Sequence, residues 1–249
     1  MSMQIKKPLA LLGENSNKFI AQGLIQHGFE VIILPADTRL APPVSSHADM
    51  LLFRLDTRVF CNEEYYRQNT DVFFRIEEYG YVIEHSDFYV SSEYPNDVAL
   101  NQAVIGKNIF GRADSCAKDI LKYAEANEYT YISIKQGYAK CSTLILNENA
   151  VISADLGIIS IAQDLNINTL QIENSVGSIS LCGYDYGFIG GASAVYEDKV
   201  FFFGNHLLHS QGEKIDTFCK NRGYTPIPLG QETLCDVGGA IILPCLNEK

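Results

Sequence analysis

Polar residues lie at the start of five apolar runs in this sequence, and they are of the types that catalyse reactions or bind ligands in other proteins. They are His47, Asp49, Asn96, Asp97, Lys140, Cys141, Ser193 and Asp236. A cysteine attacks as its thiolate, so Cys141 would need a neighbouring cation to lower its pKa, and Lys140 or His47 could supply one. His47 could also serve as an acid or a base near neutral pH.

The carboxylates of Asp49 and Asp97 predict an anchor for a cationic group of a small ligand. The predicted catalytic residues are Cys141, His47 and Asp97, and the predicted binding residues are Asp49, Asn96, Lys140, Ser193 and Asp236. A buried polar group without a partner costs about 1–3 kcal/mol, so these polar residues need a role. Three roles are open: a catalytic site, a site that binds a ligand without reaction, or a polar plug held by its own hydrogen bonds and salt bridges.

Metal and cofactor sites are not expected from the spacing of the ligand-type residues. His47 and Asp49 are two residues apart, but no second histidine is close to them in the sequence. The seven cysteines are odd in number and include no pair separated by two residues, which argues against a structural zinc site or a disulfide framework. The glycine pairs at 190–191 and 238–239 match no nucleotide-binding loop and favour close packing of strands.

The five apolar runs recur at a regular spacing along the chain. Their segments are residues 46–53, 95–100, 139–146, 191–196 and 236–243. Positions 49, 97, 141, 193 and 238 are separated by 48, 44, 52 and 45 residues. Four of the segments are followed by a tight turn with Gly, Asn or Asp and then by a second apolar strand, which is typical of hairpins. The chain therefore contains five related units of about 47 residues.

Helices and further strands are expected between these hairpins. Apolar residues at helical spacing predict helices over 15–27, 114–126 and 211–221. A strand is predicted after each of them, over 30–34, 129–134 and 224–228. The region 62–89 is irregular, and we assign no elements to it.

The two ends of the chain complement each other. The fifth unit lacks its hairpin strand, and the chain begins with an orphan strand over residues 8–12. Pairing of these residues with the fifth unit would leave no open sheet edge. We therefore expect one α/β domain over residues 1–249, a closed five-bladed propeller whose units run helix, strand, strand, strand. An open doubly wound sheet is the alternative, and it does not account for five matched segments.

A closed ring of five such units resembles the pentein fold of the guanidine-modifying enzymes, which include deiminases, dimethylaminohydrolases and amidinotransferases. Residues 94–101 and 137–142 are similar to an uncharacterised bacterial branch of that superfamily. The resemblance implies that Asp49 and Asp97 hold a guanidinium group. In the family, a cysteine of the fifth unit attacks the guanidinium carbon, and a histidine of the third unit moves protons.

The sequence departs from the family pattern at both of those catalytic positions. Tyr138 stands where the histidine is expected. Gly238 and Gly239 are kept, but residues 241–243 are aliphatic where the cysteine is expected, and Cys245 comes later. Ordinary deiminase or amidinotransferase chemistry is therefore not expected, and Cys141 is the best candidate nucleophile.

Composition limits the classes of partner. The chain has 249 residues, 47% of them hydrophobic and 20% charged, as in ordinary folded proteins. With 30 acidic and 19 basic residues, its formal net charge of −11 disfavours nucleic acid and suits a cation. No apolar stretch is long enough for a secretion signal or a bilayer span, so a cytoplasmic protein without a membrane partner is expected. The outer sheet faces make a homodimer possible.

These observations predict a pentein-like protein that binds or modifies a small guanidino or amino compound at a central polar site. If it is an enzyme, the expected chemistry is cysteine-dependent hydrolysis or transfer at a C–N bond of a guanidino or amidino compound. The alternative is a structural or protein-interaction member of the fold with a sealed polar centre.

Overall fold

The computed structural model describes residues 6–246, which form five three-stranded sheets and one two-stranded sheet. The three-stranded sheets comprise β17 (Ile241–Leu243), β1 (Leu9–Gly13) and β2 (Glu30–Leu34); β3 (Leu52–Leu55), β4 (Arg58–Asn62) and β5 (Val82–Ser86); β6 (Ala103–Ile105), β7 (Asn108–Gly111) and β8 (Thr130–Ser133); β9 (Thr143–Asn147), β10 (Ala150–Ser153) and β11 (Asn168–Gln171); and β13 (Ser193–Tyr196), β14 (Lys199–Phe202) and β15 (Thr225–Pro228). The short strands β12 (Ile179–Ser180) and β16 (Leu234–Cys235) pair with each other.

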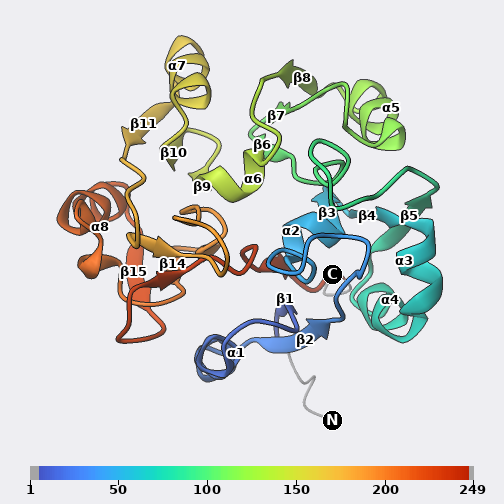
Figure 1. Ribbon diagram of the computed structural model, residues 1–249, viewed down its shortest axis with the longest axis horizontal. Helices are drawn as coiled ribbons and strands as arrows, with labels where there is room; N and C mark the ends of the chain where they lie inside the picture. The colour runs from blue at the N-terminus through green and yellow to red at the C-terminus, as the bar shows by residue number, and fades with distance from the viewer. Residues whose placement is uncertain (1–5, 247–249) are drawn as a thin grey trace.

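All five three-stranded sheets share one topology. The central strand pairs antiparallel with one neighbour and parallel with the other. A parallel pair needs a crossover connection, and here each crossover contains helix. The crossover helices are α1 (Lys18–Gln26), α3 (Glu63–Gln68) with α4 (Thr70–Glu77), α5 (Lys118–Ala126), α7 (Leu156–Asp164), and α8 (Gly212–Lys220) after the 3₁₀ turn η1 (His206–Leu208). Figure 1 shows these helices at the outside of the molecule, with the sheets between them and the centre.

The expected elements agree closely with the observed ones where the apolar spacing is regular. The helices expected over 15–27, 114–126 and 211–221 are α1, α5 and α8, and the strand over 30–34 is β2. The irregular region 62–89 contains α3, α4 and β5. Helix α7 was not predicted, because its apolar residues do not mark a single buried face: Leu156 at its start is apolar but 64% exposed.

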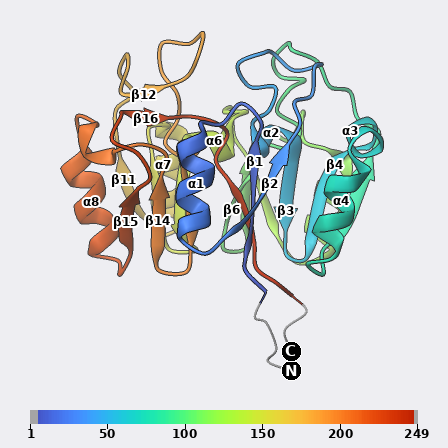
Figure 2. The ribbon, with the colours of Figure 1, turned by 90° about the horizontal axis from the view of Figure 1, so that it is seen from below.

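The first strand of the chain pairs with the last one. Leu9, Ala10 and Leu11 of β1 lie opposite residues 243, 242 and 241 of β17 in antiparallel register. Figure 2 shows the two strands side by side, blue against red. Residues 8–12 therefore supply the strand that the fifth unit lacks, as expected. The pairing buries Leu9, Leu11 and Leu243 completely.

Two of the polar segments begin as helical turns and not as strands, which corrects the sequence analysis. Residues 48–51 form α2 (Ala48–Leu51) before β3, and residues 139–142 form α6 (Ala139–Ser142) before β9. A four-residue turn is too short for its periodicity to be distinguished from that of a strand. Both turns lie near the centre of the molecule in Figure 1. Among residues 6–246, no helix has both the length and the hydropathy that a bilayer crossing requires.

Candidate functional site

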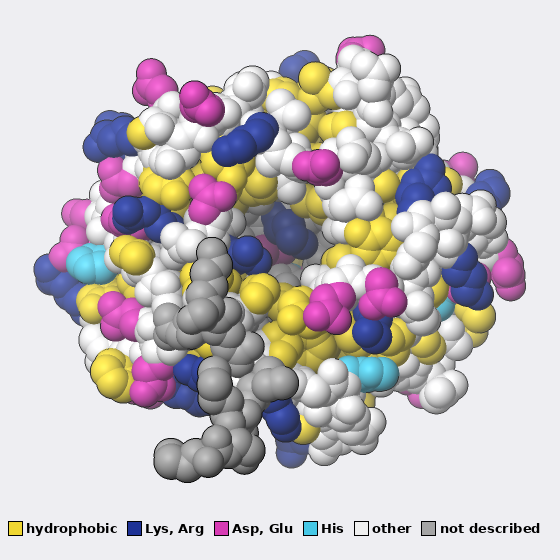
Figure 3. Space-filling view, turned by 180° about the vertical axis from the view of Figure 1, so that it is seen from behind, with side chains coloured by type: hydrophobic (Ala, Val, Ile, Leu, Met, Phe, Trp, Pro, Cys, Tyr) yellow, Lys and Arg dark blue, Asp and Glu magenta, His cyan; other side chains and the backbone are white. Residues whose placement is uncertain are grey.

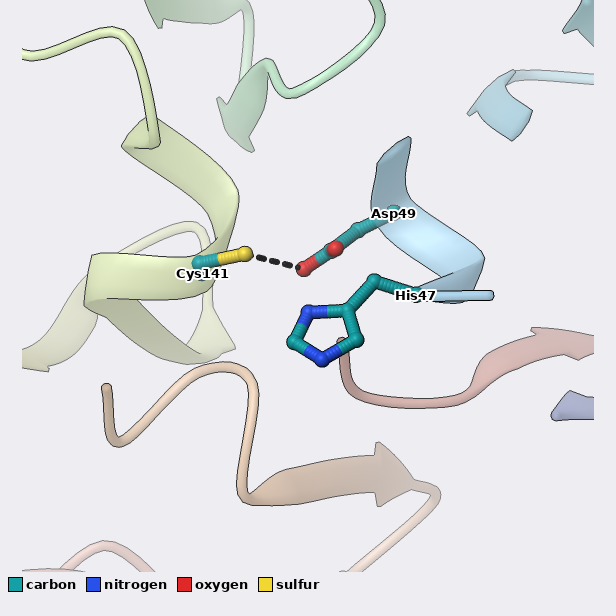
Figure 4. Close-up of side chains that lie close together, drawn as sticks. All are labelled: His47, Asp49 and Cys141. Carbon is teal, nitrogen blue, oxygen red and sulfur yellow. Dashed lines mark hydrogen bonds between the residues drawn. The ribbon is translucent and has the colours of Figure 1, made fainter. Parts of the chain in front are cut away.

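Three of the predicted site residues meet at the centre of the molecule. The Cys141 thiol on α6 donates a hydrogen bond to Asp49 Oδ2 on α2, with 3.0 Å between the heavy atoms. His47, which precedes α2, directs its ring towards the same pair (Figure 4). All three side chains are at most 4% exposed. The fold thus joins residues that are 92 positions apart in the chain.

Asn101 holds the two helical turns together, and the sequence analysis missed it. Its Oδ1 accepts the backbone N–H groups of Lys140 and Cys141, at 2.9 and 3.1 Å. Its Nδ2 donates to the Asp49 carbonyl oxygen, to Met50 Sδ and to Cys141 Sγ, at 3.3, 3.3 and 3.1 Å. The side chain therefore satisfies N–H groups at the start of α6, which have no partner inside that helix. No local pattern distinguishes it from an ordinary polar residue after an apolar run.

The Cys141 thiol is not activated in this arrangement, contrary to expectation. Burial, and then the neighbouring carboxylates, raise the pKa of Cys141 well above its ordinary value. Burial also raises the pKa of Asp49 to about 6, against the opposing charges of Lys140 and His47. The thiol donates to the Asp49 carboxylate and does not contact a cation through a hydrogen bond. The Lys140 ammonium group instead donates to the Gly190 carbonyl oxygen at 3.3 Å.

Asp97 and Asn96 lie outside this cluster. Asp97 Oδ2 accepts a 2.5 Å hydrogen bond from the hydroxyl of Tyr138. Burial raises the pKa of Asp97 in spite of that hydrogen bond. Asn96 donates its backbone N–H to Glu93, and its side chain makes no hydrogen bond within residues 6–246. Neither residue contacts Cys141 through a hydrogen bond.

Ser193 and Asp236 hold neighbouring backbone in place. Ser193 Oγ donates to the Ile189 carbonyl oxygen at 2.8 Å. The Asp236 carboxylate accepts the N–H groups of Phe188 and Gly238, at 2.8 and 3.0 Å. Its Oδ1 also lies 3.8 Å from His47 Nδ1. These contacts fix the loops on either side of His47.

Both glycine pairs serve the close packing that the sequence analysis favoured. Gly238 has φ +78°, and a Cβ there would lie 2.3 Å from the Cβ of His47. A Cβ on Gly191 would lie 1.9 Å from Asp236 Oδ1. The backbone therefore approaches His47 and Asp236 at distances that only glycine permits.

A cavity of about 290 Å³ opens next to the cluster. His47 and Cys141 are part of its lining, together with the acidic residues Asp185 and Asp236. Four aromatic side chains also line it, those of Tyr138, Tyr184, Tyr186 and Phe188. Phe188 packs against both Tyr138 and Tyr186, with ring centroids 6.3 and 6.1 Å apart. We call this space the aromatic cavity.

A second hollow, of about 420 Å³, opens on the other side of Asp49. Asp49, Lys140, Ser193 and Arg54 are among its lining residues. Figure 3 shows the hollowed face with basic and acidic side chains inside it. Lys140 and Cys141, although adjacent in the chain, thus line different spaces.

The ligand-type atoms of the cluster are close enough to share one ion. One donor atom each of His47, Asp49 and Cys141 lies within 4.8 Å of the other two. Only His47 and Asp49 are close enough in the sequence to suggest a shared metal, because Cys141 is 92 positions from Asp49.

Comparisons with known proteins place the fold. Residues 11–241 match the model of a family described as a family of unknown function, DUF6873. No curated protein is similar to the chain in sequence. Among solved structures, the dimethylarginine dimethylaminohydrolase of Pseudomonas aeruginosa is similar with a TM-score of 0.55 and 12% identity, over 94% of this chain and 96% of that chain.

Two further solved structures show the same likeness. The amidinotransferase SxtG of Microseira wollei has a TM-score of 0.56 and 11% identity, over 94% of this chain and 90% of that chain. The N-terminal domain of ArgZ, an arginine dihydrolase from cyanobacteria, has a TM-score of 0.54 and 12% identity, over 94% and 95% of the two chains. These likenesses confirm the resemblance to the pentein fold, and at such identities they concern the fold alone.

Proposed function

Starting from a chain that belongs to DUF6873, a family of unknown function, we propose that the protein binds a small organic cation in the aromatic cavity. The cation is of the amine or guanidine class. Solved proteins of the same fold are named for reactions of guanidino compounds, which supports this class of ligand. The observation that carries the proposal is the lining of the cavity, aromatic rings beside carboxylates.

The lining favours a cation over an anion or a neutral molecule. Tyr138, Tyr186 and Phe188 can place ring faces towards a positive charge, an attraction worth about 0.5–2 kcal/mol for each ring. Asp185 and Asp236 add negative charge, and no Lys or Arg is among the described residues that line this cavity. Apolar walls with a few polar groups are typical of small-molecule sites.

Binding without reaction fits this geometry better than cysteine-dependent chemistry. The pKa of Cys141 is raised, so its thiolate fraction at neutral pH is below that of an ordinary cysteine. Tyr138 stands where the resemblance to the guanidine-modifying enzymes places their catalytic histidine. Its hydroxyl donates a hydrogen bond to Asp97. A sealed plug is disfavoured because a cavity of about 290 Å³ adjoins His47 and Cys141.

We also propose that the five three-stranded sheets form a closed five-bladed α/β propeller around this cavity. The repeated sheet topology and the pairing of β1 with β17 support closure. In such a ring the starts of the five apolar segments face a common centre, where α2 and α6 bring Asp49 and Cys141 together.

Calorimetric titration with a charged ligand and its neutral isostere tests the function. Butylguanidine is a cation, and butylurea has nearly the same shape without charge. We expect the protein to bind butylguanidine and to show no binding of butylurea. Tyr186→Ala should weaken binding by about 2- to 30-fold, the equivalent of one cation–π contact, whereas Tyr186→Phe should retain it.

A matched control separates the cavity from the general surface. Tyr89 is 74% exposed and does not line the aromatic cavity, so Tyr89→Ala should leave the affinity unchanged. Equal binding of the charged and neutral compounds, or none of either, would refute the proposed function. Binding that survives Tyr186→Ala at full strength would place the ligand elsewhere.

A further inference from the structure

We propose that His47, Asp49 and Cys141 form a binding site for a divalent transition-metal ion, zinc above all, between the two cavities. The proposal goes beyond the organic cation and does not depend on it. One nitrogen, one carboxylate oxygen and one thiolate sulfur make a donor set that zinc favours over magnesium or calcium. The sequence alone led us to expect no metal, because it did not reveal the third ligand.

The donor atoms are already near the separations that a metal would impose. Zinc binds nitrogen and oxygen at about 2.0–2.1 Å and sulfur at about 2.3 Å, which puts tetrahedral ligands about 3–4 Å apart. Here Cys141 Sγ and Asp49 Oδ2 are 3.0 Å apart, and the three donors fit within 4.8 Å of one another. Small side-chain rotations would complete the geometry.

Two buried polar atoms of the cluster have no hydrogen-bond partner. They are His47 Nδ1 and Asp49 Oδ1, on side chains that are 4% and 3% exposed. Asp236 Oδ1 lies 3.8 Å from Nδ1, too far for a hydrogen bond. In Figure 4 a ring nitrogen of His47 lies beside the Cys141–Asp49 pair. Buried atoms without partners are costly, and a metal ion between them would satisfy both.

Asn101 provides the outer-shell support that metal sites commonly have. Its Oδ1 is occupied by two backbone N–H groups, so the amide orientation is fixed and Nδ2 must point to Cys141 Sγ, 3.1 Å away. An N–H group aimed at sulfur stabilises the thiolate form that a metal requires. The same side chain holds α2 against α6, and it therefore also fixes the distance between Asp49 and Cys141.

The charges balance when a dication binds. The S–H bond of Cys141 breaks, a sulfur–metal bond forms, and the proton leaves to solvent. One thiolate and one carboxylate then neutralise the two positive charges, so Asp185 and Asp236 still present negative charge in the aromatic cavity. Three protein ligands leave a fourth position of a tetrahedral metal open for water or a ligand atom.

Cobalt(II) titration of the metal-stripped wild-type protein is the direct test, because a thiolate bound to cobalt gives an intense near-ultraviolet charge-transfer band. We expect the band to saturate at one cobalt per chain, with release of about one proton, and zinc to displace the cobalt. Cys141→Ser should abolish the band and weaken zinc binding by more than about 100-fold, since even outer-shell partners contribute 10- to 100-fold.

The control is Cys182→Ser, which removes an exposed thiol and should leave the band unchanged. Circular dichroism checks that each variant is folded. If Cys141→Ser does not fold, Asp49→Asn decides the question, and cobalt and zinc should bind to it more weakly than to the wild type. No band in the wild type, a band retained in Cys141→Ser, or unchanged metal affinity in Asp49→Asn would overturn the metal site. Because these titrations contain no organic cation, failure here would leave the butylguanidine result standing, and the reverse also holds.

Discussion

At the scale of single residues, burial and the nearest neighbour together set the chemistry of Cys141. Burial, and then the neighbouring carboxylates, raise the pKa of its thiol, which donates a hydrogen bond to Asp49. The same thiol becomes a ligand only if a metal replaces its proton. The role of Cys141 therefore depends on its contact with Asp49 and does not follow from its being a cysteine.

A second buried histidine gives a pH prediction that is independent of the central cluster. His206 stacks on Phe202, with ring centroids 4.4 Å apart, and its Nε2 lies 3.2 Å from Asp216 Oδ1. Burial lowers the pKa of His206, although Asp216 opposes the shift. The folded state thus binds this proton less readily than the unfolded state, whose histidine pKa is about 6.5.

The folding contribution of His206 should therefore be complete above pH ~6.5 and should be lost as the pH falls through the lower folded-state pKa. Urea unfolding between pH 8 and pH 5 measures the effect. His206→Gln should reduce the loss of unfolding free energy on acidification. Thr217→Ala, an exposed change on helix α8 next to Asp216 that removes no titratable group, should not. An unchanged pH dependence in His206→Gln would contradict the assignment.

At the scale of elements, the site depends on turns that only glycine can make. The loop that ends at Gly238 passes directly against His47, and the Asp49 N–H donates to the Gly238 carbonyl oxygen at 3.3 Å. The loop thereby fixes the start of α2, on which Asp49 lies. A displacement of this loop would move two residues of the cluster at once.

Gly238→Ala tests this dependence against a matched position. Gly223 has φ +80°, nearly the same as Gly238, but a Cβ there would meet nothing within 4 Å. Both alanine variants should lose about 1–2 kcal/mol of unfolding free energy to the left-handed backbone. Gly238→Ala should lose about 1–3 kcal/mol more, because its Cβ collides with His47. Equal losses in urea unfolding would show that the contact with His47 is not rigid.

At the scale of the whole molecule, the pairing of β1 with β17 joins the first and the last strand of the described residues 6–246. Ala10 lies opposite Ile242, and both belong to the same buried hydrophobic cluster. The chain between residues 10 and 242 therefore forms one long loop that begins and ends at this strand pair. The stability of the sheet that contains β1 and β17 should therefore affect the entire chain.

A disulfide across this pair measures the effect. With Ala10→Cys and Ile242→Cys combined, oxidation should raise the unfolding free energy by about 2–4 kcal/mol, because the cross-link restricts a very long loop of the unfolded chain. Denaturant unfolding of the oxidised and reduced forms gives the value, and peptide mapping confirms the 10–242 link. Ala10→Cys alone should show no such gain. A linked protein without added stability would contradict the prediction that this strand pair limits the stability of the whole chain.

Much of the fold was determined by the sequence alone, because side-chain periodicity is a local property. The apolar spacing was sufficient for α1, α5, α8 and β2, and the orphan strand over 8–12 was enough to predict where the chain ends meet. The short turns α2 and α6 were not predictable, since four residues carry too little periodicity.

Only the tertiary structure decided which side chains of the repeats touch. The repeat brought Asp49 and Cys141 to a common centre, but it did not reveal that Asn101 fixes their separation, nor that Asp97 bonds Tyr138 instead. Such contacts join residues about 40 to 90 positions apart, and a hydrogen bond or a metal bond depends on differences of less than an ångström. A linear pattern determines which segments meet, whereas packing determines which atoms do.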